Sequence, residues 1–277
     1  MNNAKLPSDA LDAYFSRLEL AREGLAPDYS TLCRVHRAHA LRVPYENLDV
    51  QLSRPVTTNP LHALTKIGSG RGGWCYEMNG SLGAALQALG FSVVRMAGGV
   101  HRASQGDQMI GNHLILKTEI AGRPYLCDVG FGDGLLEPVP LAEGVYRQGH
   151  MAFRLERLED GFWRFHNDPD GAAPSFDFED APADERLLGE VCTFLQTSPE
   201  SPFVQNAVIQ RHFPDPHLSL RGKVLRRRNG DGVHDQALES AKDYIEVLAA
   251  EFGLDLPEAA SLWPQIEQRH EAVFGGD

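Results

Sequence analysis

The sequence predicts an α+β protein in three parts: an N-terminal helical bundle, a central β-barrel-like domain and a C-terminal α/β lid. Apolar residues recur at helical spacing in residues 1–90, alternate as in strands in residues 91–195, and show both patterns in residues 196–277, which open with a connecting segment. A chain of 277 residues is long enough for one large domain or two to three small ones. It can bury a substantial core without disulfides.

The first part is expected to begin with two helices. Ser8 and Asp9 are candidate N-caps for a helix whose apolar face runs from Leu11 to Leu18. A second helix is expected to start near Asp28. It should end before Pro44, because proline cannot continue a helix.

The segment Arg71–Asn79 carries the first chemical signal. In it, Cys75 follows a Gly-Gly turn and precedes apolar residues at helical spacing up to Leu89, with Gly90 at the position of a C-cap. Cys75 is therefore expected at a helix N-terminus, where the dipole and the free N–H groups favour an anion. A thiolate is such an anion and the nucleophilic form of cysteine. The competing interpretation is a buried, inert cysteine.

At Phe91 the pattern changes from helix to strand. Val93 to Met96 are expected to form a strand, and Gly98 and Gly99 to begin a polar loop that lasts to Gly111. Further strand-like runs follow at 151–158, at 162–166 and around 176–178. Together they predict a small barrel or sandwich.

Two runs in this middle part predict a hairpin that carries further chemistry. His113 opens the run 113–117, Asp128 lies near the end of the run 125–129, and a turn at 121–124 joins them. Neighbouring strands can place a histidine beside an aspartate. The order Cys75, His113, Asp128 is that of a thiol nucleophile, its base and the carboxylate that orients the base.

The last part mixes both patterns. A helix-like stretch near 184–193 leads into it, a strand is expected at 218–225, and a helix at 237–252 is closed by Gly253. The basic run 226–228 is interpreted as a solvated strand end, in preference to a phosphate contact.

These motifs resemble those of the arylamine N-acetyltransferase family. The resemblance covers Arg-Gly-Gly-x-Cys-x-Glu-x-Asn at 71–79, the histidine, and Asp-Val-Gly-Phe-Gly at 128–132. It also covers Val-Pro-Tyr-Glu-Asn-Leu at 43–48, where the family has phenylalanine in place of tyrosine, and a Ser-Pro-x-Ser-x-Phe-like segment at 197–203. Five motifs in the right order, from about Tyr14 to about Trp263, are a specific signal. The insertion of vertebrate relatives is absent, so the chain resembles the bacterial type.

The resemblance implies ping-pong acetyl transfer in xenobiotic metabolism, with acetyl-CoA as co-substrate, no metal, and an arylamine or arylhydrazine as acceptor. Cys75 would take the acetyl group, His113 would handle the proton and Asp128 would orient His113. Backbone N–H groups near Cys75 are candidate oxyanion donors. The resemblance places Phe131 in the acceptor pocket. The residues that it places near the acyl group or coenzyme A are Gly132, Val100, Tyr76 and Phe203.

The resemblance also pairs Glu46 with Arg71, as structural support for the turn before Cys75. An arginine beside a nucleophile helix needs a partner if it is partly buried; the alternative is two solvated charges. Two departures from the family pattern affect the shape of the acyl site. They are Asn112, where many relatives have threonine, and Gly98-Gly99, where Ala-Arg is expected.

Composition excludes several classes of function. The formal charge of −12 argues against a nucleic-acid partner, because phosphate binding needs a basic face. No apolar run is long enough to span a membrane. The four cysteines lack metal-ligand spacing, so a zinc site is not expected. His36 and His39 lack a third ligand, so both are expected to be surface or packing histidines. A free reactive cysteine without a signal peptide is typical of the cytoplasm.

Other functions stay open at this point. A cysteine hydrolase of the papain or transglutaminase type uses the same triad with water as acceptor. An amide synthase of macrolactam biosynthesis is a close relative that joins an amine to a polyketide acyl chain. A non-enzymatic module would lack a triad member, and none is missing. The sequence leaves open the physiological amine, the preferred acyl-CoA among acetyl, propionyl and malonyl, and a homodimer.

Overall fold

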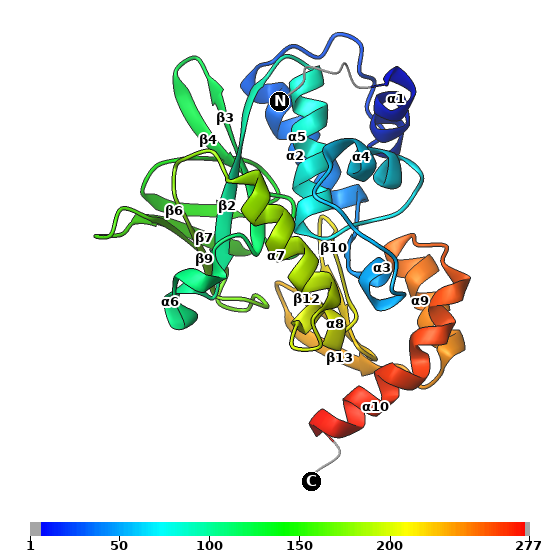
Figure 1. The fold of residues 1–277 in the computed structure, drawn as a ribbon. Coiled ribbons are helices and arrows are strands. Elements are labelled where there is room, and N and C mark those ends of the chain that lie inside the picture. Colours follow the sequence, from blue (N-terminus) through cyan, green and yellow to red (C-terminus); the bar gives the residue numbers. More distant parts are fainter. Residues whose placement is uncertain (1–6, 275–277) are drawn as a thin grey trace.

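The computed structural model describes residues 7–274, and residues 1–6 and 275–277 lie outside that range. Two antiparallel sheets and several helices make up the described part (Figure 1). The order along the chain is first helical, then mostly strands, then mixed. The α+β class with its three kinds of region is confirmed.

The N-terminal helices gather around α5, which begins at Cys75. α1 packs on α4, and α4 packs on α5. Small residues on α5 let its neighbours come close, since a Cβ on Gly83 would lie 3.3 Å from Leu116. The helices of this group are α1 (Ser8–Arg17), α2 (Tyr29–Arg42), α3 (Leu48–Gln51), α4 (Pro60–Gly68) and α5 (Cys75–Ala88).

The starts of α1 and α2 differ in how well they were predicted. Asp28 caps α2 by accepting a hydrogen bond from the Thr31 N–H at 2.8 Å, as expected. At α1 the prediction was wrong, because Pro7 with its extended backbone is the N-cap and Ser8 lies already inside the helix. The Ser8 hydroxyl donates to Asp12 at 3.1 Å instead of capping the backbone.

An eight-stranded antiparallel sheet curves into the barrel-like middle part (Figure 1). Its strands follow the order β5-β4-β3-β2-β9-β8-β7-β6. Stacked rings of Phe153, Phe165 and Phe176 fill its inner face, with centroids 5.5 and 4.8 Å apart. The strands are β2 (Ser92–Val100), β3 (His113–Ile120), β4 (Arg123–Cys127), β5 (Val139–Pro140), β6 (Gly144–Gln148), β7 (Met151–Arg157), β8 (Trp163–His166) and β9 (Ser175–Phe178).

Two expectations in this sheet need correction. Gly98 and Gly99 do not begin the loop: they lie inside β2, because Gly98 pairs with both His113 of β3 and Phe178 of β9. The hairpin between β3 and β4 is confirmed, but its turn is only residues 121–122, both with positive φ. The loop after β2 contains α6 (Arg102–Gln105) and the short helix η1 (Asp107–Met109).

The second sheet belongs mainly to the C-terminal part and has the order β1-β10-β11-β12-β13. Its first strand comes from far away in the sequence, since Tyr45 and Glu46 of β1 pair with Gln210 and Ile209 of β10. The elements of this region are β1 (Tyr45–Glu46), α7 (Glu185–Thr197), α8 (Pro202–Gln205), β10 (Val208–His212), β11 (His217–Arg221), β12 (Val224–Asn229), β13 (Gly232–Ala237), α9 (Ala241–Phe252), η2 (Pro257–Leu262) and α10 (Trp263–Phe274).

The expected single strand 218–225 is in fact a hairpin of β11 and β12, because Gly222 takes a positive φ and reverses the chain. The expected helix 237–252 starts later, at Ala241, after Ser240 caps it by accepting from the Asp243 N–H at 3.1 Å.

The basic run was also interpreted wrongly in part. Arg226 and Arg227 form partly exposed ion pairs. Alternation along β12 places Arg228 on the same face as Arg226, but Arg228 is covered there and lies 3.4 Å from Asp168. Arg228 is buried, so it is not part of a solvated strand end.

Candidate active site

Cys75 is the first residue of α5 and is almost fully buried. Its thiol donates to the Asn112 carbonyl at 3.7 Å. The backbone N–H groups of Cys75 and Tyr76 make no hydrogen bond within residues 7–274, as expected for the orphan donors of a first helical turn. The predicted placement of the thiol at a helix N-terminus is confirmed.

His113 and Asp128 lie side by side in the interior. His113 Nε2 is 2.7 Å from Asp128 Oδ2, and both side chains are buried. Because Asp128 follows directly after β4, it leaves the strand ladder and can turn toward the start of β3. With Nε2 bonded to the carboxylate, Nδ1 is the ring nitrogen that remains for the sulfur of Cys75.

The charge environment of His113 favours its imidazolium form. Burial alone would lower the pKa of His113, but the negative charge and hydrogen bond of Asp128, helped by Cys75, outweigh it and raise that pKa to about 10. A positively charged imidazolium beside a thiolate is the resting state that nucleophilic cysteines use. The site can therefore hold a thiolate without a metal.

Asn79 locks the carboxylate of Asp128 in place. Its amide donates to Asp128 Oδ1 at 2.7 Å and to the Leu114 carbonyl at 2.6 Å, and its oxygen accepts from the Val129 N–H at 3.0 Å. One side chain of the nucleophile helix thus ties both strands of the hairpin to that helix. Asn79 belongs to the motif at 71–79, but its role appears only in the folded chain.

His36 holds the backbone of Asp128. The Asp128 N–H donates to His36 Nε2 at 3.1 Å, and His36 Nδ1 faces the Leu136 carbonyl at 3.0 Å, so Nδ1 carries the proton. Burial lowers the pKa of His36 to about 4, which keeps the ring neutral. The expected packing role describes His39, whose Nδ1 lies 2.7 Å from the Tyr14 hydroxyl, better than it describes His36.

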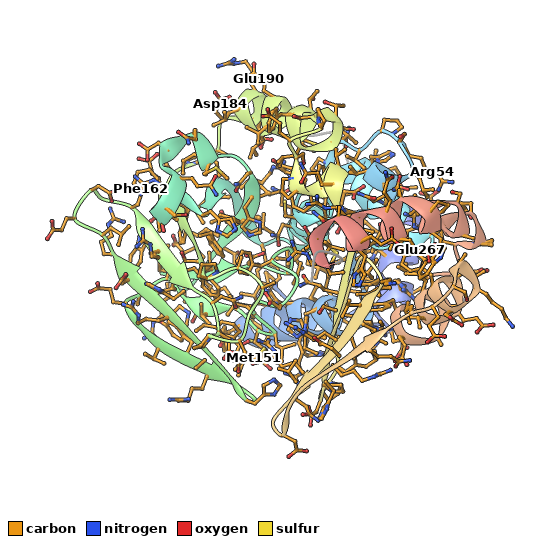
Figure 2. All side chains as sticks on the ribbon, turned by 90° about the horizontal axis from the view of Figure 1, so that it is seen from below. Arg54, Met151, Phe162, Asp184, Glu190 and Glu267 are labelled. Carbon is orange, nitrogen blue, oxygen red and sulfur yellow. The ribbon has the colours of Figure 1, made fainter. Side chains whose placement is uncertain are left out.

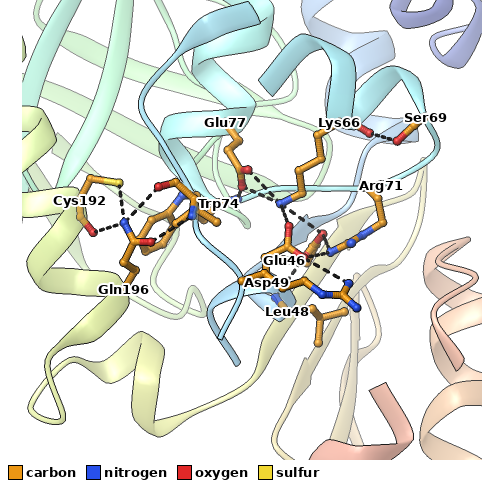
Figure 3. A network of polar contacts seen from close by, with 12 residues as sticks. Glu46, Leu48, Asp49, Lys66, Ser69, Arg71, Trp74, Glu77, Cys192 and Gln196 are labelled. Atoms are coloured by element: carbon orange, nitrogen blue, oxygen red, sulfur yellow. Dashed lines mark hydrogen bonds and ion pairs between the residues drawn. The ribbon is translucent and has the colours of Figure 1, made fainter. Parts of the chain in front are cut away.

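A cluster of buried charges lies at the other side of the first turn of α5 (Figure 3). Arg71 Nη2 is 2.9 Å from Glu46 Oε1 and 3.0 Å from Asp49 Oδ1. Glu46 is fully buried, which excludes two solvated charges. The cluster also holds Lys66 and Glu77. The sequence predicts no role for these two residues, because only the folded chain brings residues 46, 66 and 77 together.

The structure places Phe131 against His113, and it places Gly132 against Gln210 of β10. The Phe131 ring makes an edge contact with the His113 ring, with centroids 5.4 Å apart. Gly132 has φ +87°, and a Cβ there would lie 1.6 Å from the Gln210 Oε1 atom. Only glycine fits this position, both for its backbone and for its space.

The other three expected contact residues, Tyr76, Phe203 and Val100, each make a contact with a neighbouring segment. The Tyr76 hydroxyl donates to the Gly111 carbonyl at 2.5 Å, so it braces the loop behind the nucleophile. The Phe203 ring makes an edge contact with Trp74, with centroids 5.3 Å apart. Val100 is held by the side chain of Asn112, which accepts from the Val100 N–H at 2.8 Å and donates to its carbonyl at 3.1 Å.

The two departures from the family pattern have local causes. Asn112 supplies a separate acceptor, Oδ1, and donor, Nδ2, to the backbone of Val100, whereas a threonine would have one hydroxyl oxygen for both roles. A Cβ on Gly99 would lie 3.0 Å from Ile110 Cδ1 and 3.2 Å from the Met109 backbone, so a larger residue would push the α6–η1 segment outward. Both departures affect the backbone around Val100 and the α6–η1 segment. Neither replaces Cys75, His113 or Asp128.

Two features of residues 7–274 bear on metal binding and on membrane insertion. Among these residues, no three or more His, Cys, Asp or Glu side chains gather as metal ligands would. No helix in the same range has the length and apolar character needed to cross a membrane.

Comparison with known proteins gives consistent matches. Residues 28–261 match a family model described as N-acetyltransferase. An arylamine N-acetyltransferase of Mycolicibacterium smegmatis is 31% identical, over 90% of this chain and 94% of that protein. An arylamine N-acetyltransferase / N-hydroxyarylamine O-acetyltransferase of Salmonella typhimurium is 29% identical, over 93% of each.

Solved structures agree in fold. The arylamine N-acetyltransferase of M. smegmatis superposes with a TM-score of 0.83 at 30% identity, covering 93% of this chain and 97% of that one. The Mycobacterium marinum enzyme in complex with CoA has a TM-score of 0.81 at 27% identity, covering 95% and 99%.

Proposed function

Because the chain belongs to the arylamine N-acetyltransferase family, we propose that Cys75, His113 and Asp128 carry out its acetyl transfer. The protein moves an acetyl group from acetyl-CoA to an arylamine or arylhydrazine through a cysteine thioester. The observation that carries the proposal is the 2.7 Å bond between His113 and Asp128 beside a thiol at a helix N-terminus.

In the first half-reaction the Cys75 thiolate attacks the thioester carbonyl of acetyl-CoA. The oxygen gains negative charge, and the unpaired N–H groups of Cys75 and Tyr76 are the donors that face it. The C–S bond to coenzyme A then breaks, and the coenzyme A thiolate takes the proton of the His113 imidazolium. The product is an acetyl-enzyme with a neutral histidine.

In the second half-reaction the amine nitrogen attacks the carbonyl of the Cys75 thioester. His113 accepts the proton that the nitrogen loses, and Cys75 leaves as a thiolate, which restores the ion pair. Asp128 keeps the proton on Nε2 and leaves Nδ1 free to face the sulfur. Phe131, whose ring touches His113, is the wall against which an aromatic acceptor would pack.

The test is a two-step mass measurement. Acetyl-CoA alone should add one acetyl group to the protein, and a later addition of an arylamine should remove it and release the acetylated amine. Parallel runs with propionyl- and malonyl-CoA give the acyl preference. An adduct lost to water as fast as to amine would favour a cysteine hydrolase, and an adduct formed only with polyketide thioesters would favour an amide synthase.

We also propose domain boundaries at 1–90, 91–195 and 196–277. The eight-stranded sheet falls wholly inside the second range and supports them. Two elements are exceptions: β1, from the first range, joins the sheet of the third, and α7 continues two residues past the boundary at 195. Limited proteolysis should cut near residues 90 and 195 before it cuts within the sheets.

Location and assembly are further proposals. A cytoplasmic location is supported by the four free cysteines, including a nucleophile that must stay reduced. A homodimer is the alternative to a monomer of 30.5 kDa, and sedimentation velocity of the purified protein distinguishes the two.

A further inference from the structure

The ammonium group of Lys66, on α4, lies inside the protein between three carboxylates (Figure 3). Its Nζ atom is 2.9 Å from both oxygens of Glu77, 2.7 Å from Asp49 Oδ2 and 3.9 Å from Glu46 Oε1. Only 8% of the Lys66 side chain is exposed. Lysine is rarely buried this deeply unless its charge has a definite partner.

The carboxylates of the cluster do not have the same number of cationic partners. Arg71 contacts Glu46 and Asp49, and no ion pair joins Arg71 to Glu77. In the part of the chain that the structure describes, Lys66 is the one cation within 4 Å of the Glu77 carboxylate. Glu46 and Asp49 have Arg71 as a second cation, and Asp49 also lies 3.7 Å from the more exposed Arg54, so Glu77 is the carboxylate of the cluster that depends on Lys66 alone.

Glu77 contacts the two residues that precede Cys75, Gly73 and Trp74. Its Oε2 atom accepts from the Trp74 N–H at 3.3 Å, and Trp74 is the N-cap of α5. The Gly73 backbone lies directly on the same side chain, since a Cβ on Gly73 would be 2.6 Å from the Glu77 Cβ and 2.9 Å from Oε2. The position of the Glu77 carboxylate therefore constrains the backbone of Gly73 and Trp74, which leads into Cys75.

Without Lys66, this arrangement cannot persist at neutral pH. Burial already raises the pKa of Glu77 to about 7, even with Lys66 acting in the opposite direction. Removal of the ammonium would protonate Glu77 or force it toward solvent. The Trp74 N–H would then lose a charged acceptor, and the first turn of α5 would loosen.

We propose that Lys66 is a positioning residue for the nucleophile: by holding Glu77 between Gly73 and Trp74, it fixes the turn that places Cys75 against His113. The inference rests on the proposed role of Cys75 and goes beyond it, since it assigns a function to a side chain that touches neither substrate nor the triad. Figure 3 shows the chain of contacts from Lys66 through Glu77 to Trp74.

The test uses Lys66→Met, which keeps the length of the side chain and removes its charge, and Lys66→Arg, which keeps the charge. Lys242→Met is the control, because Lys242 is exposed and lies on α9 with only a 3.7 Å contact to Glu246. The readouts, on protein shown to be folded by circular dichroism, are kcat and KM for acetyl transfer and the pH profile of Cys75 alkylation by iodoacetamide.

We expect Lys66→Met to lower kcat by roughly 10- to 100-fold with little change in KM, as a misplacement of about 1 Å does. Its alkylation profile should move to higher pH, because a displaced sulfur loses its contact with the His113 imidazolium. Lys66→Arg should recover most of kcat, and Lys242→Met should match wild type. A folded Lys66→Met protein with wild-type kcat and alkylation profile would overturn the proposal and leave Lys66 as a stabilising residue only.

The double variant Lys66→Met/Glu77→Gln gives a second test. Glutamine keeps an acceptor for the Trp74 N–H without a charge that needs a partner, so the double variant should fold and regain kcat and the alkylation profile even if Lys66→Met alone unfolds. A folded double variant that keeps the shifted profile would show that Lys66 does not act through Glu77. Alkylation needs no substrate, so this result stands apart from any failure of wild type to form an acetyl-enzyme, which would instead refute the proposed function.

Discussion

Replacement of Asp128 by asparagine should disable the site while leaving the fold nearly unchanged. In the structure, Oδ1 of Asp128 accepts from the Asn79 amide at 2.7 Å and from the Gly130 N–H at 2.8 Å. Both partners are donors, so an asparagine must place its oxygen there and its NH2 group toward His113. That NH2 would donate to Nε2 of His113 and force the ring proton onto Nδ1. A nitrogen that already carries a proton cannot take one from the thiol.

The size of the effect follows from the same contacts. The pKa of His113 is raised from 6.5 to about 10 against the effect of burial, mainly by Asp128. An uncharged asparagine removes that contribution, so the imidazolium and the thiolate beside it both lose their stabilisation. The matching change in a serine-protease triad costs on the order of 10⁴ in kcat, and we expect a loss of about 10³ to 10⁴ here. The two retained hydrogen bonds should limit the loss of folding stability to about 1–3 kcal/mol.

The assay combines acetyl transfer, thermal unfolding and the pH profile of Cys75 alkylation in wild type and Asp128→Asn. Asp231→Asn, in the exposed turn before β13, is the matched control. The Asp128 variant should be folded, with a thiol that reacts only at higher pH. Identical alkylation profiles and unchanged transfer rates would refute the reasoning and make Asp128 a structural carboxylate beside a catalytic dyad.

Three other predictions follow from the site. Cys75→Ala should fold normally, because it only shortens a buried side chain, and should show no acetyl adduct in intact mass; an adduct would identify a different nucleophile. Arg71→Met leaves Glu46 buried with a weakened partner set, so urea unfolding should show a loss of about 3 kcal/mol, and a loss below about 1 kcal/mol would contradict a buried pair. Burial lowers the pKa of His36 to about 4 and of His39 to about 3. Below pH 6.5 the unfolded chain therefore binds protons at these histidines that the folded protein does not bind. The stability that the two histidines contribute is therefore complete above pH 6.5 and falls as the pH drops toward 3–4; their replacement by phenylalanine should flatten this fall in a series of urea midpoints.

The parts of the fold that local chemistry controls could be predicted from the sequence. A Gly-Gly turn followed by apolar residues at helical spacing was enough to start a helix at Cys75, and a side-chain acceptor at Asp28 was enough to start α2. The hairpin of β3 and β4 followed from alternation around a glycine. The boundaries at 222 and 241 were missed, because alternation continues across Gly222 and Ala237 is a good helix former that ends up in a strand.

The contacts between distant residues could not be predicted in this way. His36 reaches Asp128 across 92 residues, and Lys66 meets Glu77 only because α4 packs on α5. A lone histidine or lysine in a helix carries no sign of its partner, since periodicity predicts only which face of the helix turns inward. Arg228 shows the same limit: alternation along β12 places it on the same face as the exposed Arg226, and the contact with Asp168, 60 residues away, is what buries it.

The pairing of β1 with β10 has a consequence for synthesis of the protein on the ribosome. Asp128, the last of Cys75, His113 and Asp128 to emerge, leaves the exit tunnel about 80 residues before β10 does, which is a delay of roughly 4–16 s at ordinary rates of translation. Until then the strand at Tyr45–Glu46 lacks β10 on one edge, while its other edge faces the Gly73 carbonyl, which accepts from the Glu46 N–H at 2.9 Å. The Asn47 side chain lacks the Val208 N–H, from which it accepts a hydrogen bond at 2.8 Å. The segment 45–47, which places Glu46 beside Arg71, is thus not yet held by β10. Nascent chains should therefore remain unreactive toward acyl thioesters until the C-terminal strands have emerged, and shortened products that end before residue 208 should carry a thiol that is present but not activated.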